Sequence, residues 1–417
     1  MRKLTSENMN NTIRCKLPKH ERIIKTNNKT TMNKTLLVSL VSDQTIPNFL
    51  SIKTFTEADY YLFITTDLME NDERGNRRKW IMKAAGIDEQ KSFKKTVDAE
   101  SKEDVIEKLN EFNWDQFSDI IVNITGGTKM MSLACYEFFK TKTENIWYLP
   151  IRSNEYHLCD KTLVKRIVTY NSNVEEYLKC CGIHQDENRF SEKVPIIDTE
   201  YTFDFFNKFT SGKIDYSVLE KIRILFRADE AFFKKQMERK KMISLNDFED
   251  FKFISEFLKS IQFPSKNEGI LYKNEMEYLT GGWFEEFSYY LLRKNSHNPE
   301  NQFKLGVVMN PSPRDKEKAK YFTNNDLDVV LVNDNMLYVI ECKSGGMDDR
   351  ELFNKTVYLA SALKKYFGLT VKSALFTLSV MTDNQKEKAE TLGIMALDRS
   401  VFISQDRDSV IKTALNI

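Results

Sequence analysis

The chain has 417 residues, of which 41% are hydrophobic and 29% are charged, and its formal net charge at pH 7 is +1. This composition is typical of an ordinary globular protein and excludes a disordered, fibrous or membrane-embedded chain. A net charge near zero excludes a uniformly basic surface, so any contact with nucleic acid must come from local basic patches.

The length and the segment pattern predict a protein of two or three domains. Other features of the sequence predict that it stays inside the cell. No apolar run approaches the ~18 residues of a spanning helix, and the N-terminus lacks the apolar core of a signal peptide. The six cysteines form no CxxC pair, which favours reduced thiols. We therefore expect a cytoplasmic protein with no membrane partner.

Residues 1–32 are polar and have almost no apolar pattern, so we predict an extension that does not fold alone. A tail, a chain whose true start lies near Met32, and an arm that contacts nucleic acid are the alternatives.

From residue 33 to 151, short apolar runs alternate with amphipathic stretches. The strand-like runs lie at 35–41, 59–65, 118–125 and 145–151, with a weaker candidate at 94–100. Helical patterns lie between them, near 45–55, 68–85, 102–112 and 128–140. Strands joined by crossover helices predict a mainly parallel, doubly wound sheet, hence a Rossmann-like α/β domain.

Residues 152–269 are predicted to form a largely helical linker, with a small hairpin at 155–168. Residues 270–417 are predicted to form a second α/β domain with the order helix, three strands, helix, strand. These segments lie at 281–295, 303–310, 326–333, 336–343, 349–368 and 372–379.

The second and third strands of the C-terminal domain are separated only by Asp334 and Asn335, which tolerate the positive φ of a two-residue hairpin loop. The resulting register places Asp328 opposite Glu341. Because side chains on one face recur every second residue, Glu341 and Lys343 share a face that Asp328 joins. The hairpin therefore predicts a cluster of two acids and one amine.

Opposed carboxylates on apolar strands repel each other and are costly to bury, so positive charge should compensate them. Lys343 offsets one charge, and a hard divalent cation such as Mg²⁺ or Mn²⁺ would offset the rest. Such a cluster suits phosphodiester hydrolysis, in which the metal acidifies a water and the lysine orients it or stabilises the charge that develops. An ordinary cross-strand ion pair is the alternative.

This pattern resembles the PD-(D/E)XK nucleases, with Asp328 as the first acid and residues 341–343 as the E-x-K. Leu327 stands where that family often has a proline. The family often adds an acid from the preceding helix, and Glu285 shares a more apolar face than Glu286 does. The resemblance implies three metal ligands and one catalytic lysine: Glu285, Asp328, Glu341 and Lys343.

Two basic segments have open interpretations. The loop at 311–321 could follow a phosphate backbone or be merely solvated. The run at 234–241 is more typical of a solvated helix face than of a nucleic-acid patch.

The N-terminal domain has polar loops after two of its strands. Gly126 and Gly127 occupy a strand-to-helix turn where Thr128 can cap the helix, which suits anion binding at a helix N-terminus. Residues 42–45 follow another strand, and ligands of open α/β sheets bind at such ends. Neither a GxGxxG motif nor a P-loop is present, which argues against dinucleotide chemistry and NTP hydrolysis.

The segments VSLVSDQTIPNFL and NITGGTKMMS resemble the two ligand loops of CRISPR-associated Rossmann-fold (CARF) sensor domains. GGWFEE, NDLDVVLV and VIECKSG resemble the nuclease half of the CARF nucleases of type III CRISPR systems, so the resemblance covers 33–150 and 270–400. It implies an allosterically activated homodimer that binds a cyclic oligoadenylate, above all cyclic tetra-adenylate. The implied ligand contacts are Ser42, Asp43, Gln44, Thr45, Thr125, Gly126, Gly127, Thr128 and Lys129.

The function that follows is a metal-dependent endonuclease of antiviral defence, which cleaves single-stranded DNA, RNA or both, or nicks DNA. A nucleic-acid-binding regulator that does not cut, and a restriction or repair nuclease with another anionic effector, are the alternatives.

Overall fold

The computed structural model describes residues 34–71, 75–161, 163–183, 190–228, 242–246, 251–297, 299, 302–309, 326–345, 360 and 363–417. The N-terminal extension and the two basic segments at 234–241 and 311–321 lie outside these residues. The helix expected at 349–368 is described only at residue 360 and from residue 363 onward, and residues 360 and 363–367 are helical.

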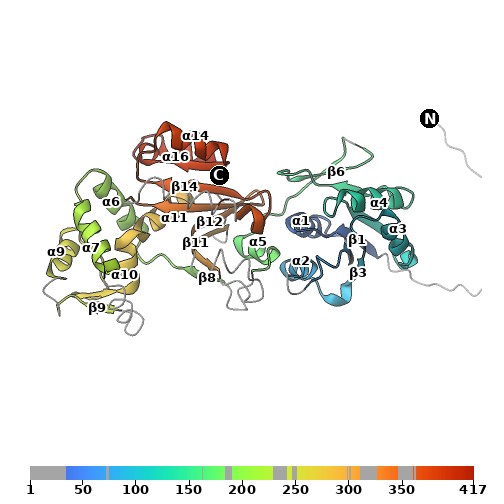
Figure 1. Ribbon diagram of the computed structural model, residues 1–417, viewed down its shortest axis with the longest axis horizontal. Helices are drawn as coiled ribbons and strands as arrows, with labels where there is room; N and C mark the ends of the chain where they lie inside the picture. Colours follow the sequence, from blue (N-terminus) through green and yellow to red (C-terminus); the bar gives the residue numbers. More distant parts are fainter. Residues whose placement is uncertain are drawn as a thin grey trace, which may run out of the picture. The chain divides into compact units, whose positions relative to one another are not determined.

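The N-terminal domain is built on a seven-stranded sheet with the order β3-β2-β1-β4-β5-β6-β7 (Figure 1). Its strands are β1 (Thr35–Leu40), β2 (Tyr60–Thr65), β3 (Ser92–Thr96), β4 (Asp119–Asn123), β5 (Ile146–Tyr148), β6 (Glu155–Leu158) and β7 (Lys165–Ile167). The first five strands are parallel, β6 pairs antiparallel with β5, and β7 pairs antiparallel with β6. The predicted sheet and hairpin are thus confirmed, and the hairpin continues the sheet past residue 151.

Helices lie on both faces of this sheet because side chains of β1 alternate between two cores. The helices are α1 (Ile46–Thr54), α2 (Arg77–Ala85), α3 (Lys102–Asn110) and α4 (Lys129–Phe139). Leu36 and Val38 pack in one core with residues of α3 and α4. Leu37 packs in another core with residues of α1 and α2. The doubly wound architecture is confirmed.

Helices dominate the described part of the connecting region, as predicted. Its elements after the hairpin are α5 (Val174–Cys180), β8 (Phe190–Lys193), α6 (Thr199–Thr210), α7 (Tyr216–Ala228), β9 (Met242–Ser244) and α9 (Lys252–Ser260). The short elements β10 (Ile270–Tyr272), which pairs with β9, and α10 (Lys273–Glu277) begin the predicted C-terminal segment. Phe206 of α6 stacks on Phe287 at a centroid distance of 3.8 Å, and Ile222 of α7 and Ile254 of α9 join the same core. The helices after β8 therefore share a hydrophobic core with the C-terminal domain.

The C-terminal domain has a six-stranded sheet with the order β15-β14-β13-β12-β11-β8 (Figure 1). Its own elements are α11 (Trp283–Asn295), β11 (Phe303–Met309), β12 (Asp326–Asn333), β13 (Met336–Lys343), β14 (Lys372–Thr377), α14 (Asp383–Thr391), β15 (Ile394–Leu397), α15 (Arg399–Phe402) and α16 (Arg407–Leu415). The predicted order of one helix and three antiparallel strands is confirmed, and β13 pairs parallel with β14. The outer strand β8 comes from the segment that we assigned to the linker.

In the part of the chain that the structure describes, no helix is long and apolar enough to cross a membrane. The five cysteines described there are free thiols, as the sequence predicts. Burial raises the pKa of Cys135 to about 12, which makes that thiol unreactive.

Candidate active site and ligand site

The catalytic candidates lie on the hairpin of β12 and β13. Its turn residues Asp334 and Asn335 have φ angles of 48° and 58°, as a two-residue hairpin loop requires. The ladder from the turn to Ile340 has the predicted register. The last pair of this ladder is Val329 with Ile340, so the same register sets Asp328 opposite Glu341.

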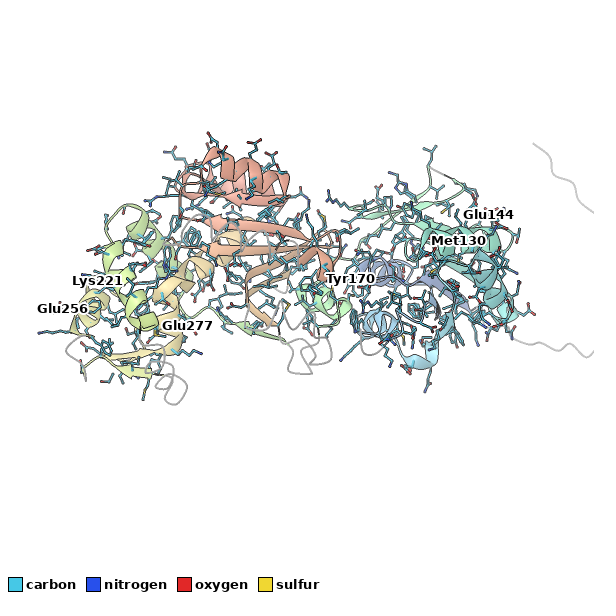
Figure 2. All side chains as sticks on the ribbon, viewed as in Figure 1. Met130, Glu144, Tyr170, Lys221, Glu256 and Glu277 are labelled. Atoms are coloured by element: carbon cyan, nitrogen blue, oxygen red, sulfur yellow. The ribbon has the colours of Figure 1, made fainter. Side chains whose placement is uncertain are left out.

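The hairpin turn is held by a segment far away in the sequence. The buried Asn335 side chain accepts hydrogen bonds from the Ser172 N–H at 2.8 Å and from the Ser172 hydroxyl at 2.9 Å. Its amide donates to the carbonyl of Tyr170 at 2.8 Å; Tyr170 precedes α5 and is labelled in Figure 2. These contacts fix the turn, and nothing in the local sequence indicates them.

Lys343 joins the two acids of the predicted cluster. Its Nζ lies 2.5 Å from Oε1 of Glu341 and 3.6 Å from Oδ2 of Asp328. Asp328 is buried and its Oδ2 also accepts the Cys342 N–H at 2.7 Å. The structure therefore brings Asp328, Glu341 and Lys343 together on one face of the hairpin, as the alternation of side chains predicts.

Burial and charge act against each other in this cluster. Burial, together with the neighbouring carboxylates of Glu341 and Glu285, raises the pKa of Asp328 well above its ordinary value. Burial alone would lower the pKa of Lys343, but the carboxylates of Asp328 and Glu341 raise it. The ammonium is therefore the charge that makes this concentration of acids tolerable.

Glu285, in the first turn of α11, extends the cluster through a second lysine. Its Oε2 lies 3.4 Å from Nζ of Lys193, and the same ammonium lies 2.7 Å from Oδ2 of Asp326. Sequence reasoning identified Glu285 but missed Lys193 as a member of the site. The hairpin register expected from the sequence sets Asp326 opposite Lys343, on the strand face that it shares with Asp328, but no role was predicted for it. Lys193 comes from β8, and no local signal indicates it.

The adjacent acid, Glu286, faces other partners. It is buried, and its two carboxylate oxygens accept the N–H groups of Ile196 at 3.1 Å and Ile197 at 3.3 Å. Burial raises the pKa of Glu286 to about 7, although these two hydrogen bonds lower it. Glu286 thus fixes the segment after β8 to α11, whereas Glu285 contacts Lys193 beside the other acids. The expectation that Glu285 is the more inward of the two is wrong, because Glu286 is the buried one and turns toward the segment after β8.

The carboxylate oxygens of these acids suit a hard divalent cation, but the acidic side chains are not gathered around one point. Within the described residues, no group of three or more His, Cys, Asp or Glu side chains is arranged closely enough to hold a metal ion. In this geometry the Lys343 ammonium is the cation that bridges Glu341 and Asp328. Carboxylate oxygens are nonetheless the ligands that Mg²⁺ and Mn²⁺ prefer. When all four acids are ionised, the two lysines leave two negative charges for such an ion.

The two polar loops of the N-terminal domain meet where β1 and β4 end. At Gly126 a Cβ atom would lie 2.1 Å from the carbonyl oxygen of Leu40, so only glycine fits beside β1. Gly127 has φ of 75°, in the left-handed region. Thr128 caps α4 by accepting the Met131 N–H at 3.2 Å, as predicted.

A cavity of about 220 Å³ opens beside these loops. The predicted residues Asp43, Gln44, Thr45 and Thr125 line it, whereas Ser42, Gly126, Gly127, Thr128 and Lys129 do not. Lining residues that the sequence did not single out include Arg77, Trp80, Tyr148 and Leu369. The Arg77 guanidinium lies 4.6 Å from the Trp80 ring centroid and pairs with Asp43 at 2.9 Å. The cavity therefore has an aromatic and cationic wall that contacts the first loop through Asp43.

The first loop also contacts elements outside the sheet. Gln44 accepts the backbone N–H of Leu369 at 3.0 Å through its side-chain oxygen. The hydroxyl of Thr45 is buried and donates to the carbonyl of Cys180 in α5 at 2.7 Å. Ser42 hydrogen-bonds within the loop, to the backbone of Gln44. One short loop thus connects the end of β1 to two later parts of the chain.

Two protein-family models match the sequence. The Card1 CARF domain matches residues 36–177, and the Card1-like endonuclease domain matches residues 272–405. The chain is a CARF nuclease of the Card1 type. The CARF match extends past residue 151, as the sheet does through β7.

Two solved structures share the fold of this CARF nuclease over nearly the whole chain. Can2 from Sulfobacillus thermosulfidooxidans in complex with cyclic tetra-adenylate matches at 20% identity and a TM-score of 0.59, covering 92% of this chain and 98% of that one. Protein VC1899 from Vibrio cholerae matches at 15% identity and a TM-score of 0.66, covering 91% of this chain and 97% of that one. No curated protein matches the sequence significantly.

Proposed function

We propose that this CARF nuclease is a divalent-metal-dependent endonuclease of type III CRISPR defence that a cyclic oligoadenylate activates in the cytoplasm. The observation that carries the proposal is the contact of Lys343 with Glu341 and Asp328 on the endonuclease domain. Its substrate is a phosphodiester of single-stranded DNA or RNA, or one strand of duplex DNA.

In this proposal Glu285, Asp328 and Glu341 are the residues that would hold Mg²⁺ or Mn²⁺, and the ion would supply Lewis acidity toward water and phosphate. Asp328 keeps its position because the Cys342 N–H holds one of its oxygens. The Lys343 ammonium would orient the attacking water or stabilise the charge that develops on the phosphate.

The activator in this proposal is cyclic tetra-adenylate, bound by residues 42–45 and 125–129 of both subunits of a homodimer. The similar Can2 structure contains cyclic tetra-adenylate. A two-fold dimer presents the same loops twice and so matches a symmetric ring. Gln44 contacts Leu369 and Thr45 contacts Cys180, so a ring that binds to this loop can change the positions of residues outside the sheet.

The test is a cleavage assay with labelled DNA and RNA, Mn²⁺ or Mg²⁺, and a panel of cyclic oligoadenylates. We expect cleavage only with metal and activator together, and a loss of at least 100-fold in Glu341→Ala and Lys343→Ala, as for a missing group in electrostatic catalysis. Glu387→Ala on the exposed face of α14 is the matched control and should cleave normally.

Activator-dependent binding without any cleavage would instead identify a regulator. Metal-dependent cleavage that ignores every cyclic oligoadenylate would identify a nuclease with another effector.

A further inference from the structure

Lys193 brings a second ammonium to the acid cluster from a part of the chain that neither family match covers. It ends β8, the outer strand of the six-stranded sheet, in the interval between residues 177 and 272. Its Nζ lies 2.7 Å from Asp326 and 3.4 Å from Glu285. The interval between the two matched domains therefore supplies part of the site.

The neighbouring strand is shaped around this side chain. The pairing of β11 with β8 shifts register between Leu305 and Val308. Within the shift, Gly306 has φ of 57°, and a Cβ there would lie 2.3 Å from Cδ and 2.5 Å from Cγ of Lys193. A glycine-containing bulge thus lets the lysine stem cross β11 toward the acids.

Helix α11 fixes the segment that carries Lys193. Glu286 accepts the N–H groups of Ile196 and Ile197, and the hydroxyl of Tyr290 donates to the Ile197 carbonyl at 2.7 Å. Glu285 stands beside Glu286 on the same helix. The lysine and the acid it contacts are therefore positioned by one helix.

The side chains of the site differ in solvent exposure, and we call its exposed part, Lys193 and Asp326, the mouth of the site. The side chains of Lys193 and Asp326 are each 39% exposed, compared with 8% for Asp328 and 19% for Glu341. A phosphodiester that approaches the inner acids meets Lys193 first. Because those acids repel an anion, an ammonium at the mouth lowers the cost of approach and provides a donor for a phosphate oxygen.

We propose that Lys193 binds a backbone phosphate of the nucleic-acid substrate at the mouth of the active site. This inference rests on the proposed nuclease function. Asp326 and Glu285 hold the ammonium in place before substrate arrives, and the bulge at Gly306 keeps its stem directed inward.

The test measures binding of a fluorescein-labelled single-stranded oligonucleotide by anisotropy, with activator, and with Ca²⁺ in place of Mn²⁺, over a range of salt concentrations. We expect Lys193→Met to weaken binding about tenfold and to reduce the slope of log K against log salt by about 0.7, the loss of one phosphate contact on a single strand. Lys193→Arg should restore most of the affinity. Calorimetric titration with Mn²⁺ alone should show no loss of metal affinity in Lys193→Met.

Lys304→Met is the matched control. Lys304 lies on the adjacent strand β11 and pairs with Glu192 at 2.5 Å; Glu192 is on the strand face opposite to that of Lys193. Lys304→Met should bind like the wild type. A Lys193→Met protein with unchanged affinity and salt slope, or with lost Mn²⁺ binding, overturns the proposal. If the wild type itself neither binds nor cleaves nucleic acid, the proposed function fails as well.

Discussion

Replacing Gly126 by alanine tests whether the two ligand loops depend on a close approach of backbones. The added Cβ would lie 2.1 Å from the Leu40 carbonyl oxygen, whereas ordinary contacts begin above 3 Å. The turn after β4 and the end of β1 must therefore separate by about 1 Å, at an overpacking cost of about 1–3 kcal/mol. The same oxygen accepts the buried Asn48 amide at 2.9 Å, and weakening that hydrogen bond adds about 1 kcal/mol. The free energy of unfolding should fall by about 2–4 kcal/mol.

The assay is urea unfolding followed by circular dichroism, with calorimetric titration of cyclic tetra-adenylate on the folded variant, whose affinity should fall at least tenfold. Gly86→Ala is the control, since Gly86 has φ of 73° and no atom within 4 Å of the added Cβ. It should cost about 1 kcal/mol of backbone strain and leave the ligand affinity intact. A Gly126→Ala protein as stable as the wild type, with full affinity, would refute the reasoning.

Three further predictions concern single side chains. Asp328→Asn should stabilise the metal-free protein in thermal unfolding and abolish cleavage, because burial and nearby carboxylates raise the pKa of Asp328 and so disfavour its charge. Gln44→Ala should lower the ratio of cleavage rates with and without activator several-fold, because the loop loses its hydrogen bond to Leu369. Asp398→Asn should lose about 2 kcal/mol in urea unfolding at pH 7, since Asp398 is buried and pairs with Lys386 at 2.9 Å. Burial raises the pKa of Asp398, but hydrogen bonds from Ser400 and Lys386 outweigh this effect and lower the pKa below 3.8. The ionised carboxylate therefore stabilises the folded state above pH 3.8. The difference in stability between wild type and variant should shrink as the pH falls through the folded pKa.

The hairpin was predictable because its geometry is local. Two turn residues with positive φ fix the register, and the period of two then fixes which side chains share a face. Asp328, Glu341 and Lys343 follow from these rules without knowledge of any other segment. The same alternation of Leu36, Leu37 and Val38 indicates a sheet covered on both faces.

The rest of the site was not predictable because it depends on pairing between distant segments. Strand β8 (Phe190–Lys193) is short and mostly polar, and its place beside β11 is decided by tertiary contacts that its own sequence does not indicate. The hydrogen bond from Ser172 to Asn335 joins residues that lie 163 positions apart in the sequence. The contact of Gln44 with Leu369 spans 325 residues. No period or spacing contains such information.

The lysines explain how the acid cluster can fold before any metal binds. Removing one partner of a buried ion pair leaves an uncompensated charge, which is strongly destabilising. Here Lys343 compensates Glu341 and Asp328, and Lys193 compensates Asp326 and Glu285. Metal binding must therefore compete with internal cations, which predicts a modest Mn²⁺ affinity that increases when Lys193 is neutralised. A lysine that served only to fill space would not produce that increase.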